Sequence, residues 1–386
     1  MNRKVVAILL FCVFAAHAQT TDWPTASPGS VGIDEKGLAT FDAELASGKF
    51  GNVDGLTVIR HGKLVFDKRY ARDYDKTYGE DAKKQSPLNA HDPTGPYNYY
   101  NSWWHPWYQR GDLHTLQSVS KTITSIIVGV ARTRGDFPDI DTPALRYFDE
   151  SKVQNVDDRK RRMTIRNLLT MSAGLDWNEG LPYQDPKNTG SQMEASLDWM
   201  QYTIDRPMAF EPGKTWAYNS GATQILAHVF HAATGQDIEE YAVKYLFGPL
   251  GIKQYYWKRS PSGLVDAEGG FYLRPRDLAK LWYLFLKNGV WDGKQIVSAD
   301  WVKESVKPAF DLNGAKYGLK WWLYPYGKDN SMIAWSGSGF GGQMPMAFPD
   351  YDMVVVYTAW NVNPGTPVLR RRDAIDRIIA LADATK

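Results

Sequence analysis

Ser118-Val119-Ser120-Lys121 opens the stretch that decides the fold, and apolar residues follow it at helical spacing. These residues are Val119, Ile123, Ile126, Ile127 and Val130. The pattern predicts an amphipathic helix over 118–134, which Gly135 ends. Residues three apart share a helix face, so the Ser118 hydroxyl and the Lys121 amine can meet. A lysine with a lowered pKa can take the proton of such a serine, which makes the serine a nucleophile.

The first helical turn adds free N–H groups and a positive dipole end, which favour an oxyanion at the same place. The S-x-x-K pattern alone also fits a helix-capping serine followed by a surface lysine. The choice between these two interpretations depends on the rest of the chain.

The first 18 residues are predicted to be a secretory signal peptide that is cut after Ala18. Arg3 and Lys4 precede an apolar run that ends at an A-x-A site over 16–18. Cys12, the only cysteine, lies inside this segment, so the mature chain is expected to form no disulfide. No later apolar run is long enough to span a membrane. We therefore expect a periplasmic or secreted protein without stable membrane insertion.

Charge and composition exclude other functional classes. The chain has 45 Lys and Arg residues against 43 Asp and Glu residues, so it lacks the basic excess that suits nucleic acid. His228 and His231 share a helix face without a third ligand, so we expect neither a metal nor a cofactor. The expected partner is a small-molecule substrate, and the sequence leaves the oligomeric state open.

Strand patterns lie at both ends of the chain, and helical patterns lie between them. Hairpins are predicted at 56–66 and 342–358, a further hairpin around Asp292-Gly293, and helices at 118–134, 164–171, 192–204, 220–234, 237–247, 275–288 and 368–383. We expect an α/β fold of the α+β type. Its antiparallel sheet is built from the N- and C-terminal segments, is flanked by helices, and carries an all-helical insertion domain. Residues 19–115 and 262–386 are predicted to form the sheet domain, and residues 116–261 the mostly helical domain.

A ring-rich segment precedes the candidate nucleophile. Residues 97–108 hold seven Tyr and Trp residues within a long stretch of little periodicity, which is typical of a functional loop. We expect this segment to wall the active site, with Trp104 and Trp107 contacting the substrate. A loop pinned to the surface by its rings is the alternative.

Two further motifs follow along the chain. Tyr218-Asn219-Ser220 lies where an extended segment enters a predicted helix, and a tyrosine at such a junction can point into a cleft. Two nearby cations would favour its phenolate. Trp335-Ser336-Gly337-Ser338-Gly339 leads into a strand, and its glycines allow the backbone to approach a ligand closely. An N–H of this edge, together with the Ser118 N–H, would form an oxyanion hole.

In this order, the three motifs resemble the S-x-x-K, Y-x-N and K-T-G or H-x-G motifs of the class C β-lactamase and penicillin-recognising serine hydrolases. That family includes family VIII-type esterases and 6-aminohexanoate-oligomer hydrolases. Segments 164–175, 247–251 and 269–279 are similar to further segments of the family. The resemblance implies that Ser118 is acylated, that Lys121 and Tyr218 share the acid and base work, and that the N–H groups of Ser118 and Ser338 form the oxyanion hole. It also implies that the substrate contacts Asn219, Ser220, Trp335, Ser336 and Gly337.

Two departures from the family pattern bear on the substrate. Ser220 stands where the family usually has Asn, and Trp335 stands where β-lactamases have a lysine that helps to hold a substrate carboxylate. The missing cation argues against penicillins and peptidoglycan stems, and Trp at this position is similar to the esterases of the family. We expect a secreted serine hydrolase, with esterase activity first. The alternatives are a linear-amide (6-aminohexanoate-type) hydrolase, a β-lactamase, a D-Ala carboxypeptidase or D-aminopeptidase and, outside enzymes, an inactive penicillin-recognising binding module.

Overall fold

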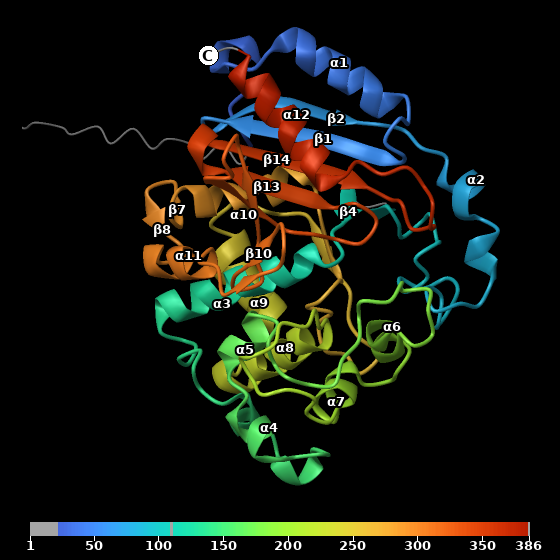
Figure 1. Ribbon diagram of the computed structural model, residues 1–386, viewed down its shortest axis with the longest axis vertical. Helices are drawn as coiled ribbons and strands as arrows, with labels where there is room; N and C mark the ends of the chain where they lie inside the picture. Colours follow the sequence, from blue (N-terminus) through green and yellow to red (C-terminus); the bar gives the residue numbers. More distant parts are fainter. Residues whose placement is uncertain (1–21, 109–110, 385–386) are drawn as a thin grey trace, which may run out of the picture.

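The computed structural model describes residues 22–108 and 111–384 (Figure 1). The predicted signal peptide, with Cys12, lies outside these residues. Within the described part of the chain, no helix is long and apolar enough to cross a membrane.

An eight-stranded antiparallel sheet joins the two ends of the chain, which confirms the expected fold class. Its strand order is β2-β1-β14-β13-β12-β11-β10-β9. Leu56 of β1 lies opposite Tyr357 of β14, and Val58 lies opposite Val355. The strands are β1 Val53–Arg60, β2 Lys63–Arg69, β9 Phe310–Asp311, β10 Lys316–Tyr317, β11 Trp322–Tyr326, β12 Met332–Ser336, β13 Met344–Phe348 and β14 Met353–Ala359.

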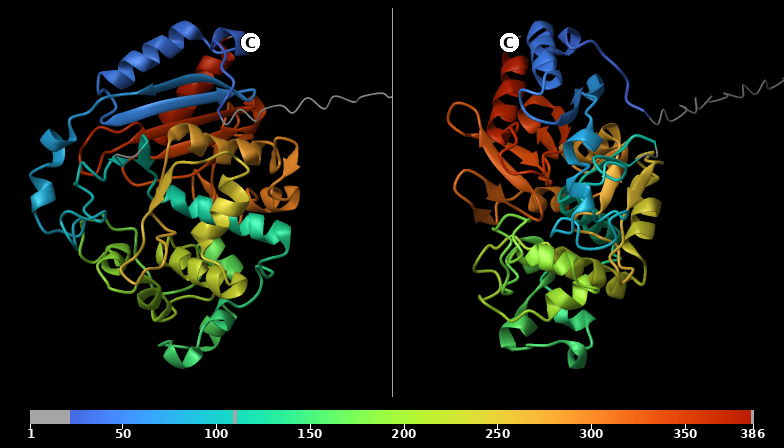
Figure 2. Two further views of the ribbon diagram at one scale, coloured as in Figure 1. Left: turned by 180° about the vertical axis from the view of Figure 1, so that it is seen from behind. Right: turned by 90° about the vertical axis from the view of Figure 1, so that its right-hand side faces the viewer.

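Both faces of this sheet are covered. Successive residues of a strand point to opposite faces, so Val354 and Val356 belong to one buried cluster while Val355 and Tyr357 belong to another. The first cluster includes residues of α10 (Pro275–Leu286), and the second includes residues of α1 (Glu35–Ala46) and α12 (Arg371–Asp383). α1 and α12 therefore cover one face together, and α10 covers the other (Figures 1 and 2).

The helical region lies below the sheet, next to α3 (Val119–Arg134) (Figure 1). Every residue of α3 from Val119 to Ala131 is buried, because the helix packs against α8 (Gly221–Thr234) and α11 (Ala299–Ser305). The pattern predicted at 192–204 forms two helices, because the Asp198 side chain caps the second one. The remaining helices are α2 Tyr74–Tyr78, α4 Asp158–Arg162, α5 Ile165–Leu169, α6 Thr189–Glu194, α7 Trp199–Ile204 and α9 Ile238–Ala242, the last continuing into a π-helical turn over Val243–Phe247.

A small four-stranded sheet was not predicted by the sequence patterns. Its order is β3-β4-β6-β5, and its strands are β3 Trp107–Tyr108, β4 Leu113–Thr115, β5 Tyr255–Trp257 and β6 Phe271–Leu273. Strands of two or three residues are too short to show a period of two. The predicted hairpin near Asp292 is present as β7 Val290–Trp291 and β8 Lys294–Gln295. The Leu116 N–H donates to the Phe271 carbonyl at 2.9 Å, so the chain just before Ser118 is tied to the chain just after residue 270.

Candidate active site

Ser118 stands at the start of α3, directly after a strained residue. Gln117 has a φ of 49°, which is the left-handed region that costs a non-glycine residue free energy and that is found often at functional sites. Ser118 is the N-cap residue of α3, but its side chain makes no capping hydrogen bond. The alternative interpretation, in which the Ser118 side chain caps the helix, is therefore wrong.

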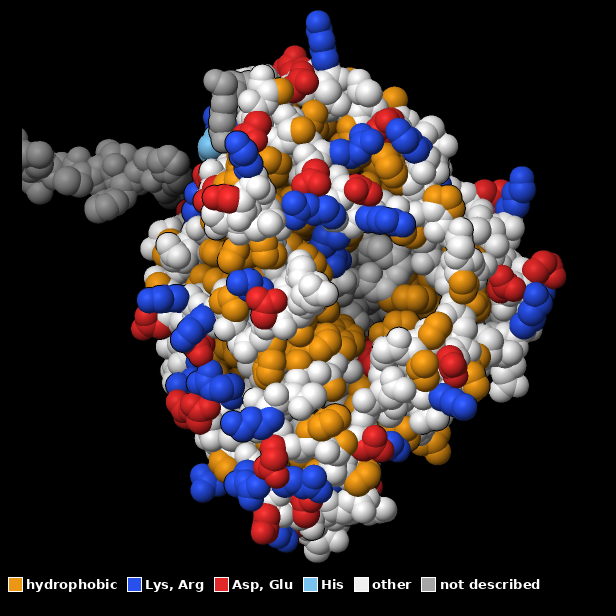
Figure 3. Space-filling view, in the orientation of Figure 1, with side chains coloured by type: hydrophobic (Ala, Val, Ile, Leu, Met, Phe, Trp, Pro, Cys, Tyr) orange, Lys and Arg blue, Asp and Glu red, His pale blue; other side chains and the backbone are white. Residues whose placement is uncertain are grey.

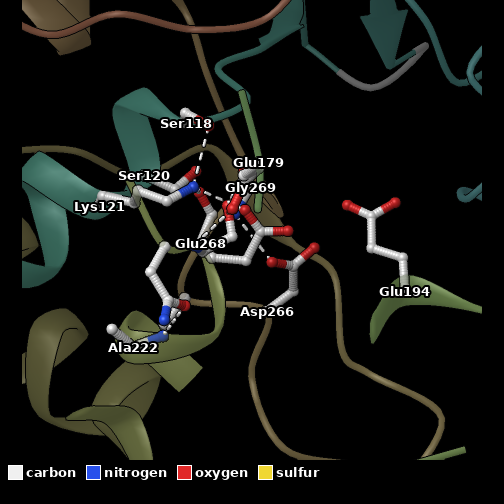
Figure 4. A network of polar contacts seen from close by, with 12 residues as sticks. Ser118, Ser120, Lys121, Glu179, Glu194, Ala222, Asp266, Glu268 and Gly269 are labelled. Carbon is white, nitrogen blue, oxygen red and sulfur yellow. Dashed lines mark hydrogen bonds and ion pairs between the residues drawn. The ribbon is translucent and has the colours of Figure 1, made fainter. Parts of the chain in front are cut away.

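The structure brings Ser118, Lys121 and Tyr218 together. Lys121 Nζ lies 2.9 Å from Ser118 Oγ (Figure 4), and the lysine is only 1% exposed. The Tyr218 ring centroid lies 5.3 Å from Lys121 Nζ, and Ser118 is close enough to Tyr218 to lower the pKa of its hydroxyl. Desolvation raises the pKa of Tyr218, and the Lys121 charge opposes this rise without cancelling it.

Glu268 is a second partner of Lys121 that the sequence motifs did not identify. Lys121 Nζ donates to Glu268 Oε2 at 2.7 Å and to the Glu268 backbone carbonyl at 2.8 Å (Figure 4). Burial would lower the pKa of Lys121, but Glu268 first, and then Tyr218 and Glu179, together raise that pKa above its ordinary value. A base role of Lys121 needs a lowered pKa, and the ion pair with Glu268 acts in the opposite direction.

A small pocket opens onto Ser118, and three glutamates line it. The other lining residues include aromatic rings and small polar groups. The lining consists of Leu88, Tyr99, Gln117, Ser118, Glu179, Tyr183, Gly190, Ser191, Glu194, Ser220, Glu268 and Phe340. Figure 3 shows the molecule hollowed near the middle of one face, with hydrophobic side chains around the hollow.

Glu179 orders the turn that carries Tyr218. Its Oε2 accepts from the Ser220 N–H and from Trp177 Nε1, both at 2.8 Å. Its Oε1 accepts from the Ser220 hydroxyl at 2.6 Å and from the Tyr183 hydroxyl at 2.8 Å. Ser220, at the position where the family usually has Asn, is therefore directed to a buried carboxylate, and both residues line the pocket.

Glu194 lines the same pocket as Glu268. The Tyr99 hydroxyl lies 2.9 and 3.0 Å from the two Glu194 carboxyl oxygens. Burial first, and the Glu268 charge second, raise the pKa of Glu194 well above its ordinary value. Burial and the neighbouring Glu268 charge therefore both favour the protonated form of Glu194. Through Tyr99, the segment 97–108 reaches the pocket, as expected.

The glycine-rich stretch after β12 packs against the turn that carries Ser118. A Cβ on Gly339 would lie 2.3 Å from the Leu116 carbonyl oxygen, and one on Gly337 would lie 3.1 Å from Val119 Cγ1. Ser338 lies between these two close contacts, and the contribution of its N–H to an oxyanion hole stays a prediction. Its hydroxyl accepts from Arg371 Nη2 of α12 at 2.9 Å.

Three of the residues expected to contact the substrate also make contacts within the fold, and their contact with a substrate stays a prediction. Asn219 Oδ1 accepts from the Ala222 N–H in the first turn of α8 at 2.9 Å. The Ser336 hydroxyl donates to the Gly337 carbonyl at 2.7 Å and lies 3.0 Å from the Pro345 carbonyl. Trp335 packs against the core on the α10 side of the sheet.

Trp104 and Trp107 are not among the residues that line the pocket opening onto Ser118, and their contact with a substrate stays a prediction. Trp104 stacks on Tyr108 with 5.0 Å between ring centroids and donates to the Thr94 carbonyl. Trp107 packs edge-on against His114, with 4.5 Å between ring centroids. Both rings therefore pack against residues of the small four-stranded sheet.

Four charged residues of the site were missed by the sequence analysis: Glu179, Glu194, Glu268 and Arg371. They come from separate segments, and nothing in the spacing links them to Ser118. Glu268 alone had a signal, because it directly precedes the Gly269-Gly270 pair of a segment that is similar to the family. Among the described residues, no group of three or more His, Cys, Asp or Glu side chains could hold a metal ion.

Comparison with known proteins places the chain among hydrolases of one family. The Beta-lactamase family model matches residues 46–380. A 6-aminohexanoate-dimer hydrolase of Paenarthrobacter ureafaciens is 26% identical over 277 residues, which is 66% of this chain and 68% of that protein. Esterase EstB of Burkholderia gladioli is 28% identical over 169 residues, which is 40% of this chain and 39% of the esterase. The solved structure of a family VIII carboxylesterase matches with a TM-score of 0.63 at 15% identity, over 93% of this chain and 98% of that chain. Because the family model covers most of the sequence, the chain belongs to the Beta-lactamase family of serine hydrolases, among relatives that include esterases and amide hydrolases.

Proposed function

We propose that this protein is a serine hydrolase that cleaves an ester or amide bond through an acyl-enzyme on Ser118, and that esters are its preferred substrates. The observation that carries the proposal is the 2.9 Å contact between Ser118 Oγ and Lys121 Nζ, with the Tyr218 ring 5.3 Å from the same lysine nitrogen. Burying a lysine against a serine is costly, and perturbed ionisable groups of this kind gather at catalytic sites. An inactive binding module has no need of them.

In the acylation step, Ser118 Oγ attacks the substrate carbonyl carbon while its proton passes to the Lys121–Tyr218 pair. The carbonyl electrons move to the oxygen, which the N–H groups of Ser118 and Ser338 would stabilise. Collapse of this intermediate breaks the ester or amide bond, and the departing alcohol or amine takes up the proton. A water molecule then attacks the acyl-enzyme by the same route and releases the acid.

Substrate preference is inferred from the cations around the site. Trp335 stands where β-lactamases have a lysine, and a charge-assisted hydrogen bond is worth about 1.5–3 kcal/mol. An ester without a carboxylate loses nothing by this change, and an esterase is among the relatives. Arg371 does place a cation beside Ser338. That contact, with a relative named as a 6-aminohexanoate-dimer hydrolase, makes a linear amide that carries a carboxylate the second candidate.

A side-by-side panel tests the substrate class. Wild-type enzyme is given p-nitrophenyl esters, nitrocefin, D-alanyl peptides and 6-aminohexanoate oligomers, and Ser118→Ala is the control for each. We expect the highest kcat/KM for an ester and no turnover by the variant. If nitrocefin is the best substrate, the inference from Trp335 is wrong.

We also propose that the enzyme acts in the periplasm or outside the cell. The support is the signal peptide pattern over 1–18. N-terminal sequencing of the protein purified from the periplasm or medium should start at Gln19. Accumulation in the cytoplasm with residues 1–18 retained would contradict this proposal.

A further inference from the structure

The role of Glu268 goes beyond the family motifs. We propose that Glu268 is a positioning residue that keeps Lys121 an ammonium, so that Lys121 acts on Ser118 as a fixed positive charge and Tyr218 takes the Ser118 proton. This inference rests on the proposed function, because Ser118 must be the nucleophile.

The charge of Glu268 decides between the two forms of Lys121. A hydroxyl can donate or accept, so the three contacts of Lys121 Nζ with Ser118 and Glu268 fit an ammonium or an amine equally well. Glu268 is 4% exposed, and its Oε2 lies 2.7 Å from Lys121 Nζ. A neutral lysine would leave this carboxylate buried without a counter-charge, which is strongly unfavourable. Accordingly, burial would raise the pKa of Glu268, but Lys121 holds it below the ordinary value.

Neighbouring groups leave this ion pair intact. Burial and the Glu268 charge favour the neutral form of Glu194, so Glu194 adds no competing negative charge beside Lys121. Lys258 lies 3.6 Å from Asp266, which provides its own counter-charge. Burial, and then the Lys121 charge, lower the pKa of Lys320 well below its ordinary value, so both effects favour its neutral form. The titratable groups that face the pair are Glu179, Glu194, Tyr218, Lys258, Asp266 and Lys320.

The proton path follows from the charge of Lys121. The reactive form has Lys121 as an ammonium and Tyr218 as a phenolate. Burial opposes this phenolate, and the adjacent positive charge of Lys121 lowers the cost of forming it. As Ser118 Oγ bonds to the carbonyl carbon, its proton moves to the Tyr218 oxygen. Tyr218 then passes this proton to the departing alcohol or amine and becomes a phenolate again.

Removing the Glu268 charge distinguishes two mechanisms. In the proposed one Tyr218 takes the Ser118 proton beside an ammonium, and in the other neutral Lys121 is the base. Both reactive forms carry the same number of protons, so the pH profile of the wild type cannot distinguish them. Without the carboxylate, burial lowers the pKa of Lys121, so the form with neutral lysine gains population. Glu268→Gln should therefore slow a reaction that needs the ammonium and speed a reaction that needs the amine.

The experiment measures the rate at which a fluorophosphonate probe labels Ser118 as a function of pH. We expect the rate for Glu268→Gln to level off at a lower pH than the wild-type rate. We also expect the limiting labelling rate of the variant at alkaline pH to fall by at least about tenfold. Each unit by which the Lys121 pKa falls lowers the ratio of ammonium to amine by a factor of ten. An equal or higher limiting rate in the variant would overturn the proposal.

Two further variants separate charge from structure. Glu268→Asp, which keeps the charge, should recover part of the limiting rate. Glu150→Gln is the matched control, because it makes the same glutamate-to-glutamine change at an exposed ion pair with Arg161 rather than beside Lys121. We expect its profile to keep the shape of the wild-type profile. A loss as large as that of Glu268→Gln would contradict a specific role for Glu268.

A measurement on the wild type covers the case in which Glu268→Gln does not fold. With ¹⁵N-labelled lysine, the Lys121 Nζ signal can be assigned by its absence in Lys121→Ala. We expect an ammonium signal in neutral and mildly alkaline buffer, and an amine signal at neutral pH would overturn the proposal. If the wild type does not react with the probe at all, the proposed function fails rather than the role of Glu268.

Discussion

Lys121 contacts Ser118, Tyr218 and Glu268 at once, so its contribution cannot be divided into independent parts. Its ammonium bonds to the nucleophile and to a carboxylate, and it lies over the ring of the tyrosine. The pKa of Tyr218 is itself set by burial against this charge. Lysine and tyrosine therefore form one proton-transfer unit.

This unit predicts non-additive losses. Lys121→Met and Tyr218→Phe should each lower kcat/KM for an ester by roughly 10²–10⁴-fold, which is the usual size of a positioned acid–base contribution. The double variant should lose little more, because residues that act as a unit are strongly non-additive. The four rate constants of this cycle are the measurement, and full additivity would count against a shared proton path.

The helices and strands differ in how well the sequence predicts them. The 118–134 helix was predicted to its ends, because its apolar period is strong and Gly135 stops it with a φ of 80°. The hairpin that forms β13 and β14 was also predicted, because Pro349 and Asp352 mark the turn between its two apolar strands. The four-stranded sheet was missed because its strands have only two or three residues. The break between α6 and α7 was missed because it depends on one capping side chain, that of Asp198.

The glycine-rich stretch after β12 gives a prediction at this scale. In Gly339→Ala the new Cβ would lie 2.3 Å from the Leu116 carbonyl oxygen, so the stretch must move away from the Ser118 turn. We expect kcat to fall by at least about tenfold, since small displacements in an active site are costly. Gly180→Ala is the control, because its nearest neighbour would lie at 3.7 Å and the fold need not shift. Equal kcat values for both variants would contradict this account.

The whole molecule supplies what no single motif contains. Three motifs spread from Ser118 to Ser338 could be predicted to meet, because the family resemblance links them. The sequence could not predict that four other charged residues belong to the site, because each lies on a different segment and packing between distant parts of the chain places it there. These residues are Glu179, Glu194, Glu268 and Arg371. Trp104 and Trp107 pack in the region of the smaller sheet, and their predicted contact with a substrate stays a prediction.

The central claim is that Ser118 is the nucleophile, and intact-mass analysis after treatment with a fluorophosphonate tests it most directly. We predict one covalent adduct on the wild type, mapped by peptide digestion to Ser118, and the same adduct on Ser30→Ala, which changes an exposed serine near the N-terminal helix. Ser118→Ala should carry none. An unmodified wild type, or an undiminished adduct on Ser118→Ala, would contradict the account.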